Sequence, residues 1–268
     1  MKLASRMKER LDSKSYTSWK DMCIYLGRYA FAVEKFKGNS VLDVACGTGF
    51  GSNYLLNQDA MSVIGADYSD IAIGYAHTRY SKKGLKFVIV DAQQMPFPDN
   101  SFDTVVSMET IEHLPDYQAF LRECKRVLRP GGVFICSTPN KNVSMPVTGE
   151  LNPFHIKEFN ADELNNLLNQ YFDNVSLYGY LRWTKKSTKG MIVEIPISAL
   201  YALPLSLQSF FLNIISFITR YIFRGYHPVS LEDIDEKDFA KLISQSYKPF
   251  PLNEATPEYL FAIGYKSP

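Results

Sequence analysis

The chain alternates between two hydrophobic patterns from residue 40 to residue 157. Five short segments are apolar at most positions, which is typical of parallel strands buried on both faces. They are Ser40–Ala45, Ser62–Asp67, Lys86–Asp91, Asp103–Ser107 and Gly132–Ser137. Apolar residues at helical spacing predict helices at Ser69–Tyr80 and Tyr117–Val127 between them. Strands that alternate with helices predict an α/β fold, in which a parallel sheet has helices on both faces.

The same reading predicts three further elements and one long insertion. A helix is expected near Ala161–Gln170, a strand near Asn174–Tyr180 and a last strand at Tyr259–Tyr265. The segment between the last two strands is too long for a hairpin loop, so we expect an insertion there that forms a lid with an apolar helix. The predicted regions are an N-terminal helical cap at 1–39, a core at 40–180, the insertion at 181–257 and the final core strand at 258–268.

Residues 195–219, inside this insertion, contain no charged side chain. Pro196 and Pro204 interrupt the segment, and mildly polar residues recur along it at helical spacing. We favour a lid or a core-packing helix. An interfacial membrane helix and a membrane-spanning helix remain the two alternatives.

The composition narrows the function classes. A net charge of +1 gives no electrostatic basis for binding nucleic acid. The four cysteines have neither metal-site nor disulfide spacing, which favours a reducing compartment. The first twenty residues lack the apolar core of a signal peptide. We therefore expect a cytoplasmic protein, with residues 195–219 as a route to peripheral contact with the inner face of the membrane.

Candidate chemistry begins where the first strand ends. The motif VLDVACGTGFGS at residues 41–52 joins this strand to a turn that contains Gly47, Gly49 and Gly51. Glycine lets a ligand approach the backbone closely and tolerates a positive φ. The spacing is Gly-x-Gly-x-Gly, not the Gly-x-Gly-x-x-Gly of dinucleotide binders, and Asp43 precedes the turn. This difference favours S-adenosylmethionine (SAM) over NAD as the ligand.

Further motifs follow in a family-specific order. They are GADYS, DAQQMPFPDNSFD, SMETIEHL and RVLRPGGVFICSTPN. With them, the chain from about Tyr25 to Tyr180 resembles the class I SAM-dependent methyltransferases, in the type 11-like branch that methylates small molecules. The resemblance implies a Rossmann-like sheet of seven strands, whose last strand runs antiparallel and corresponds to Tyr259–Tyr265.

The resemblance also implies a set of cofactor contacts. Asp67, at the end of the second strand, would accept hydrogen bonds from both ribose hydroxyls, and Tyr68 would cover the adenine. Asp91 would lie at the adenine amino group. Asp43 would orient the glycine loop near the ammonium group of SAM, and Arg28 would pair with its carboxylate. The full expected set is Arg28, Asp43, Ala45, Gly47, Gly49, Asp67, Tyr68, Asp91, Ala92 and Glu109.

Three polar residues that follow the fourth strand are expected at the reacting end. Glu109, Glu112 and His113 are spaced i, i+3 and i+4, so a helical turn would place them on one face. A distant cluster, NPFHIKE at residues 152–158, adds His155 and Glu158. Transfer of a methyl group to oxygen requires an aligned nucleophile whose proton can leave. We expect His113, Glu112 and His155 to be catalytic.

The same region also suggests a divalent metal site. Glu109, Glu112, His113 and His155 offer mixed oxygen and nitrogen ligands for an ion such as Mg²⁺, which would lower the pKa of a bound hydroxyl. This arrangement is similar to that of the small-RNA 2′-O-methyltransferases and, in part, of ubiquinone-pathway O-methyltransferases. The alternative needs no metal: Glu109 lines the SAM pocket and His113 is the general base.

The expected acceptor follows from a weaker resemblance. Residues 152–180 are similar to methyltransferases of bacterial polysaccharide and other glycan pathways. We therefore expect O-methylation of a saccharide or a lipid-linked glycan precursor, and no nucleic-acid substrate. Two alternatives remain. One is an O-methyltransferase of a quinone or a phenolic, polyketide-like molecule, and the other is a SAM-binding subunit without catalytic activity.

Overall fold

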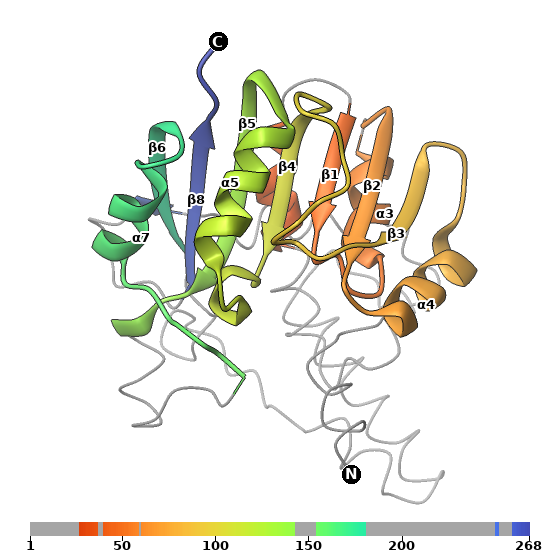
Figure 1. Ribbon diagram of the computed structural model, residues 1–268, viewed down its shortest axis with the longest axis horizontal. Helices are drawn as coiled ribbons and strands as arrows, with labels where there is room; N and C mark the ends of the chain where they lie inside the picture. The colour runs from red at the N-terminus through yellow and green to blue at the C-terminus, as the bar shows by residue number, and fades with distance from the viewer. Residues whose placement is uncertain (1–26, 37–39, 59, 143–153, 181–249, 252–258) are drawn as a thin grey trace, which may run out of the picture.

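A computed structural model describes residues 27–36, 40–58, 60–142, 154–180, 250–251 and 259–268 (Figure 1). Its strands are β1 (Ser40–Val44), β2 (Ser62–Asp67), β3 (Leu85–Ile89), β4 (Phe102–Met108), β5 (Leu128–Pro139), β6 (Asp173–Tyr180), β7 (Phe250–Pro251) and β8 (Tyr259–Tyr265). They form one sheet in the order β3-β2-β1-β4-β5-β8-β6-β7. Strands β1 to β5 pair in parallel, whereas β8 runs antiparallel to both β5 and β6.

The predicted seven-stranded sheet with an antiparallel last strand is confirmed. The short strand β7 is an addition that the sequence pattern did not predict, because two residues are too few to show a period. β7 pairs with the outer side of β6 and belongs to the segment predicted as an insertion. Strand β5 starts at Leu128 instead of Gly132, because Phe102 of β4 already pairs with Leu128 before the register shifts.

Helices cover both faces of the sheet, as predicted. The helices are α3 (Phe50–Asn57), α4 (Asp70–Tyr80), α5 (Tyr117–Val127) and α7 (Ala161–Leu168), with a 3₁₀ turn η1 (Ile111–His113). Residues 27–33 are also helical. Residues 27–33, α3 and α4 pack on one face of the sheet through one apolar cluster. Helices α5 and α7 pack on the opposite face through a second cluster (Figure 1).

Alternation along each strand separates these two clusters. On β1, Val41 belongs to the first cluster, whereas Leu42 and Val44 belong to the second. Successive side chains of a strand point to opposite faces, so a strand covered on both sides is apolar at almost every position. The exception is Asp43, which lies between two apolar neighbours and has no solvent exposure.

Apart from β7, the insertion predicted at 181–257, including the apolar segment 195–219, lies outside the described residues, as does most of the predicted N-terminal cap. In the part of the chain that the structure describes, no helix is both long and apolar enough to cross a membrane.

Candidate active site

The glycine loop, residues 45–49, joins the carboxyl end of β1 to α3. Gly47 has φ 56° and Gly49 has φ 82°, and both values are in the left-handed region that favours glycine. A Cβ on Gly49 would lie 2.6 Å from the Phe87 ring, whereas the position of a Cβ on Gly47 has no atom within 4 Å. Ala45 also has a positive φ, 59°. The loop therefore packs tightly against the sheet on one side and is open at Gly47, where a ligand can meet the backbone.

Asp67, at the end of the neighbouring strand β2, holds this loop. Its Oδ2 accepts a hydrogen bond from the Gly47 amide at 2.9 Å, and its Oδ1 accepts one from the Ser69 amide at 2.8 Å. Ser69 in turn caps α4, as its side chain accepts from the Ala72 amide. These two bonds orient the Asp67 carboxylate beside the glycine loop. This arrangement fits a ligand that presents two vicinal hydroxyls.

Asp43 is the fully buried carboxyl group of β1. The Ser52 hydroxyl of α3 donates to Asp43 Oδ2 at 2.6 Å, and the Tyr29 hydroxyl lies 3.3 Å from Oδ1. Burial raises the pKa of Asp43 to about 7, although both hydroxyl groups oppose the rise. Gly51 makes room for this contact, because a Cβ there would lie 2.0 Å from the Tyr29 ring. Asp43 thus connects β1 to α3 and to the N-terminal helix at residues 27–33.

Arg28, which is buried, and Glu109, which is partly buried, form an ion pair. Arg28 Nη2 lies 3.2 Å from Glu109 Oε2, and the Arg28 guanidinium stacks 4.6 Å from the centre of the Tyr259 ring. The Ser137 hydroxyl donates to Glu109 Oε1 at 2.7 Å. Glu109 has φ 50°, so the chain turns sharply directly after β4. The two residues expected to contact the cofactor therefore contact each other in this structure.

The residues expected around the adenine lie at the ends of β2 and β3. Tyr68 is 76% exposed, so its ring is available to cover a flat ligand. The exposed Asp91 accepts a hydrogen bond from the Gln93 amide at 2.9 Å, and the neighbouring Ala92 is partly buried. Because β2 and β3 are paired, these residues share one edge with Asp67.

Glu112 occupies a more constrained position in the 3₁₀ turn η1. Its carboxyl group is buried, and its Oε2 accepts a hydrogen bond from the Thr138 hydroxyl at 2.9 Å. Among the described residues, Oε1 has no hydrogen-bond partner. Burial, followed by the nearby charge of Glu109, raises the pKa of Glu112 well above its usual value.

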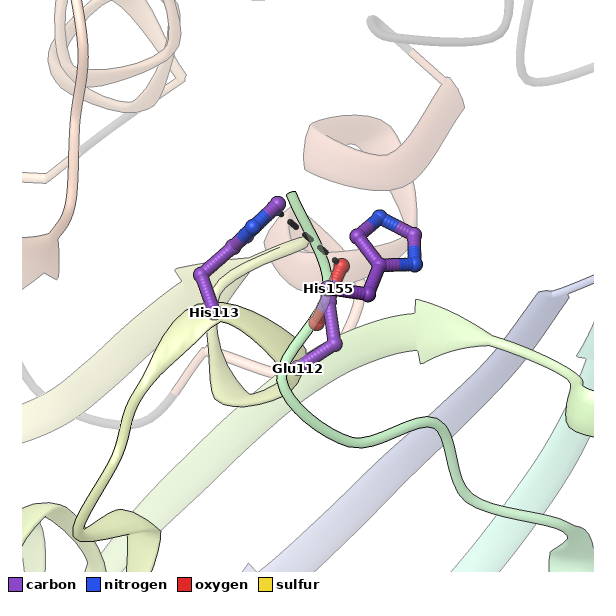
Figure 2. Close-up of side chains that lie close together, drawn as sticks. All are labelled: Glu112, His113 and His155. Carbon is purple, nitrogen blue, oxygen red and sulfur yellow. Dashed lines mark ion pairs between the residues drawn. The ribbon is translucent and has the colours of Figure 1, made fainter. Parts of the chain in front are cut away.

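Two histidines complete a cluster around Glu112 (Figure 2). One ligand atom each of Glu112, His113 and His155 lie within 4.8 Å of one another. His113 Nε2 is 3.9 Å from Glu112 Oε1, and the two imidazole rings meet edge to face with centroids 4.9 Å apart. The segment 154–158 reaches this turn because the Ile156 and Lys157 amides both donate to the Glu112 carbonyl, at 2.7 and 3.1 Å.

The structure divides the predicted metal set. Glu112, His113 and His155 come together, whereas Glu109 is held by Arg28 and Ser137 and is not part of this cluster. The i, i+3, i+4 spacing of Glu109, Glu112 and His113 predicted a single helical turn. The positive φ of Glu109 ends that regularity before η1 begins, so Glu109 does not share a face with Glu112.

Several residues that hold the site carboxyl groups in place were not predicted from the sequence. Tyr29 and Ser52 hold Asp43, while Ser137 and Thr138 hold Glu109 and Glu112. Ser137 and Thr138 lie near the carboxyl end of β5, next to β4 in the sheet. Their position after an apolar strand was the available signal. Nothing in the local pattern around Tyr29 indicates that it contacts Asp43.

Comparisons with known proteins agree with this geometry. Residues 42–136 match the family model described as a methyltransferase domain. A Mycolicibacterium smegmatis protein named "Probable S-adenosylmethionine-dependent methyltransferase" is 41% identical over 52% of this chain and 54% of its own length. A fatty-acid O-methyltransferase of the same species is 38% identical over 41% of this chain and 40% of its own. This chain thus spans about half the length, or less, of these curated relatives.

A solved structure supports the fold. The SAM-dependent methyltransferase of Archaeoglobus fulgidus superposes with a TM-score of 0.57 at 18% identity, covering 91% of this chain and 93% of its own. At this identity the likeness concerns the fold alone. Residues 42–136 thus match a methyltransferase domain, and the observed strand order and the loop between β1 and α3 agree with this match.

Proposed function

We propose that the protein transfers the methyl group of SAM to an oxygen atom of a saccharide or of a lipid-linked glycan precursor. The observation that carries this proposal is the meeting of two sites at one edge of the sheet. Asp43 of β1 is in register with Val106 of β4, so the glycine loop after β1 and the turn after β4 begin side by side. Ligands of open α/β sheets bind at this carboxyl edge.

The chain's own residues fit the cofactor on one side of this edge. The open backbone at Gly47 and the Asp67 carboxylate suit the ribose and the methionine part of SAM. When bound, SAM supplies a methyl group on a positively charged sulfur. In the transfer, the acceptor oxygen forms a bond to this carbon, and the carbon–sulfur bond breaks with its electron pair remaining on sulfur.

The other side of the edge fits removal of the acceptor proton. The His113 Nδ1 lies 2.9 Å from the Phe154 carbonyl, which only accepts, so Nδ1 donates. This leaves the lone pair on Nε2, beside the buried Glu112. In this state His113 is able to act as a general base toward a hydroxyl. A divalent cation held by the same cluster would instead lower the pKa of the hydroxyl.

We infer the class of acceptor from the exposed apolar side chains on either side of His155. Phe154 is 44% exposed and Ile156 is 55% exposed, so apolar surface flanks this histidine. An acceptor with an apolar part would cover it. The name of the fatty-acid O-methyltransferase relative is in keeping with a lipid-like acceptor. The segment 195–219, which lies outside the described residues, remains proposed as a lid or a peripheral contact of a cytoplasmic protein with the membrane.

The proposal is tested by transfer from SAM carrying a radiolabelled methyl group. Octyl glucoside offers vicinal hydroxyls on an apolar chain, and oleic acid offers a carboxylate on a similar chain. We expect label in octyl glucoside that resists mild alkali, since an ether survives where an ester is hydrolysed. Label in oleic acid alone would contradict the hydroxyl assignment. Absence of both SAM binding and transfer would contradict the proposed function as a whole.

A further inference from the structure

The strongest unexplained feature of the described residues is the buried Glu112 Oε1. It has no hydrogen-bond partner there, and the nearest nitrogen, His113 Nε2, is 3.9 Å away. A buried carboxylate oxygen without a partner is costly. Hydrogen-bond reach ends near 3.2 Å, so the histidine does not satisfy this oxygen directly.

Both histidines make a hydrogen bond through Nδ1. His113 Nδ1 lies 2.9 Å from the Phe154 carbonyl, and His155 Nδ1 lies 2.6 Å from Glu158 Oε1. A carbonyl and a carboxylate both accept, so each Nδ1 carries a proton, and the neutral form of each ring presents its lone pair at Nε2. Metal-binding histidines are oriented in this way, since they donate the other ring N–H to a carboxylate or a backbone carbonyl.

His113 Nε2 and Glu112 Oε1 lie 3.9 Å apart. This gap is too wide for a direct hydrogen bond, but two ligand atoms of one ion can be separated by this distance. Atoms that each coordinate one ion at about 2.1 Å are at most about 4.2 Å apart. The ligand atoms of Glu112, His113 and His155 lie within 4.8 Å of one another, so a contraction of about half an ångström brings them into range.

We propose that Glu112, His113 and His155 bind a divalent transition-metal ion, such as Mn²⁺, Co²⁺ or Zn²⁺, with Glu158 as the residue that orients His155. Two imidazoles and one carboxylate favour these ions over Mg²⁺, which prefers oxygen ligands. Glu109 is not a ligand, because Arg28 already neutralises it and would repel a cation there. The ligand set thus differs from the four residues expected from spacing.

In the proposed methyl transfer, the ion would activate the acceptor hydroxyl. The ion would lower the pKa of an acceptor hydroxyl bound to it, and the hydroxyl proton would pass to solvent water. His113 then serves as a ligand and not as the general base. This role rests on the proposed methyl transfer, whereas binding of the ion does not.

The test is a titration of the full chain, freed of metal by a chelator, with Co²⁺ alone. Visible d–d absorption reports ligand binding to Co²⁺, and SAM and acceptor are left out. We expect one Co²⁺ per chain in the wild type and at least tenfold weaker binding in Glu112→Gln and His155→Asn. The matched control is His77→Gln, because His77 is an exposed histidine on α4. It should bind as the wild type does.

Circular dichroism identifies any variant that fails to fold. His113→Asn then keeps the test valid, since the His113 side chain is 32% exposed and its loss disturbs the interior least. Absence of Co²⁺ binding to the wild type, or equal binding by all folded variants, would overturn the proposal. Because SAM is absent from this titration, failure here leaves the proposed methyl transfer standing. Failure of SAM binding with intact Co²⁺ binding would do the reverse.

Discussion

The two halves of the carboxyl edge are built in different ways. On the cofactor half, Gly47 and Asp67 are positioned by the backbone of β1 and β2 and bond to each other over twenty residues of chain. On the reacting half, His113 meets a segment 41 residues away through the carbonyl of Phe154. The first half depends on the strand–turn–helix geometry. The second depends on a buried carboxyl group and the loop that folds over it.

We therefore expect cofactor binding and methyl transfer to depend on different residues of this domain. A change at Glu112 should leave the glycine loop intact, because none of the hydrogen bonds described at Gly47, Asp67 or Asp43 reaches it. The Arg28–Glu109 ion pair is the described link between the halves, since Glu109 follows β4 and Arg28 belongs to the same N-terminal helix as Tyr29. Variants on each side therefore test whether the two halves act separately.

The largest expected effect is on turnover in Glu112→Gln. The amide keeps the shape and accepts from Thr138, but it removes the carboxyl group beside His113. We expect about 1000-fold slower methyl transfer to octyl glucoside, within the range measured for lost acid–base groups. The affinity for SAM should change less than threefold. A parallel loss of SAM affinity would show that the halves are not separable.

A smaller effect is expected on stability in Gly51→Ala. The new methyl group would overlap the Tyr29 ring, so the N-terminal helix has to shift. Overpacking of this kind costs about 3 kcal/mol of unfolding free energy. Thermal unfolding measures the loss, and Gly74→Ala is the control, because a Cβ there meets no atom within 4 Å. Equal stability of the two variants would contradict the close contact between Tyr29 and α3.

Some of the contacts behind these predictions follow from local sequence patterns, whereas others arise only from tertiary folding. The strands and the helices α4 and α5 were predicted because buried parallel strands and capped helices have local patterns, such as Ser69 before α4. The position of Asp67 after β2 followed from the same pattern. The separation of Glu109 from Glu112 was not predictable, since the spacing does not show the positive φ at Glu109. The pairing of His155 with Glu158 depends on tertiary folding of the 154–158 segment.

The smallest effect concerns the pH dependence of stability. The pKa of Asp43 is raised from 3.8 to about 7 by burial, so the folded state holds a proton that the unfolded state has lost in this range. The free energy of unfolding should therefore fall as pH rises from about 4 to about 7. Asp43→Asn removes this part of the fall, which is about 1.4 kcal/mol for each unit of pKa shift. Urea unfolding of both proteins at pH 4.5 and pH 7.5 measures it. An unchanged slope in the variant would contradict a protonated Asp43.

The separation of the two halves is tested most directly by calorimetric titration of SAM into the wild type, Asp67→Asn and Glu112→Gln. Asp67→Asn weakens the acceptor for the ribose hydroxyls, and hydrogen bonds to a charged group contribute about 1.5–3 kcal/mol each. We predict about 100-fold weaker binding in Asp67→Asn and unchanged binding in Glu112→Gln, with Asp70→Asn at the exposed start of α4 as the matched control. Equal affinities in Asp67→Asn and the wild type, or equal losses in Asp67→Asn and Glu112→Gln, would contradict the account.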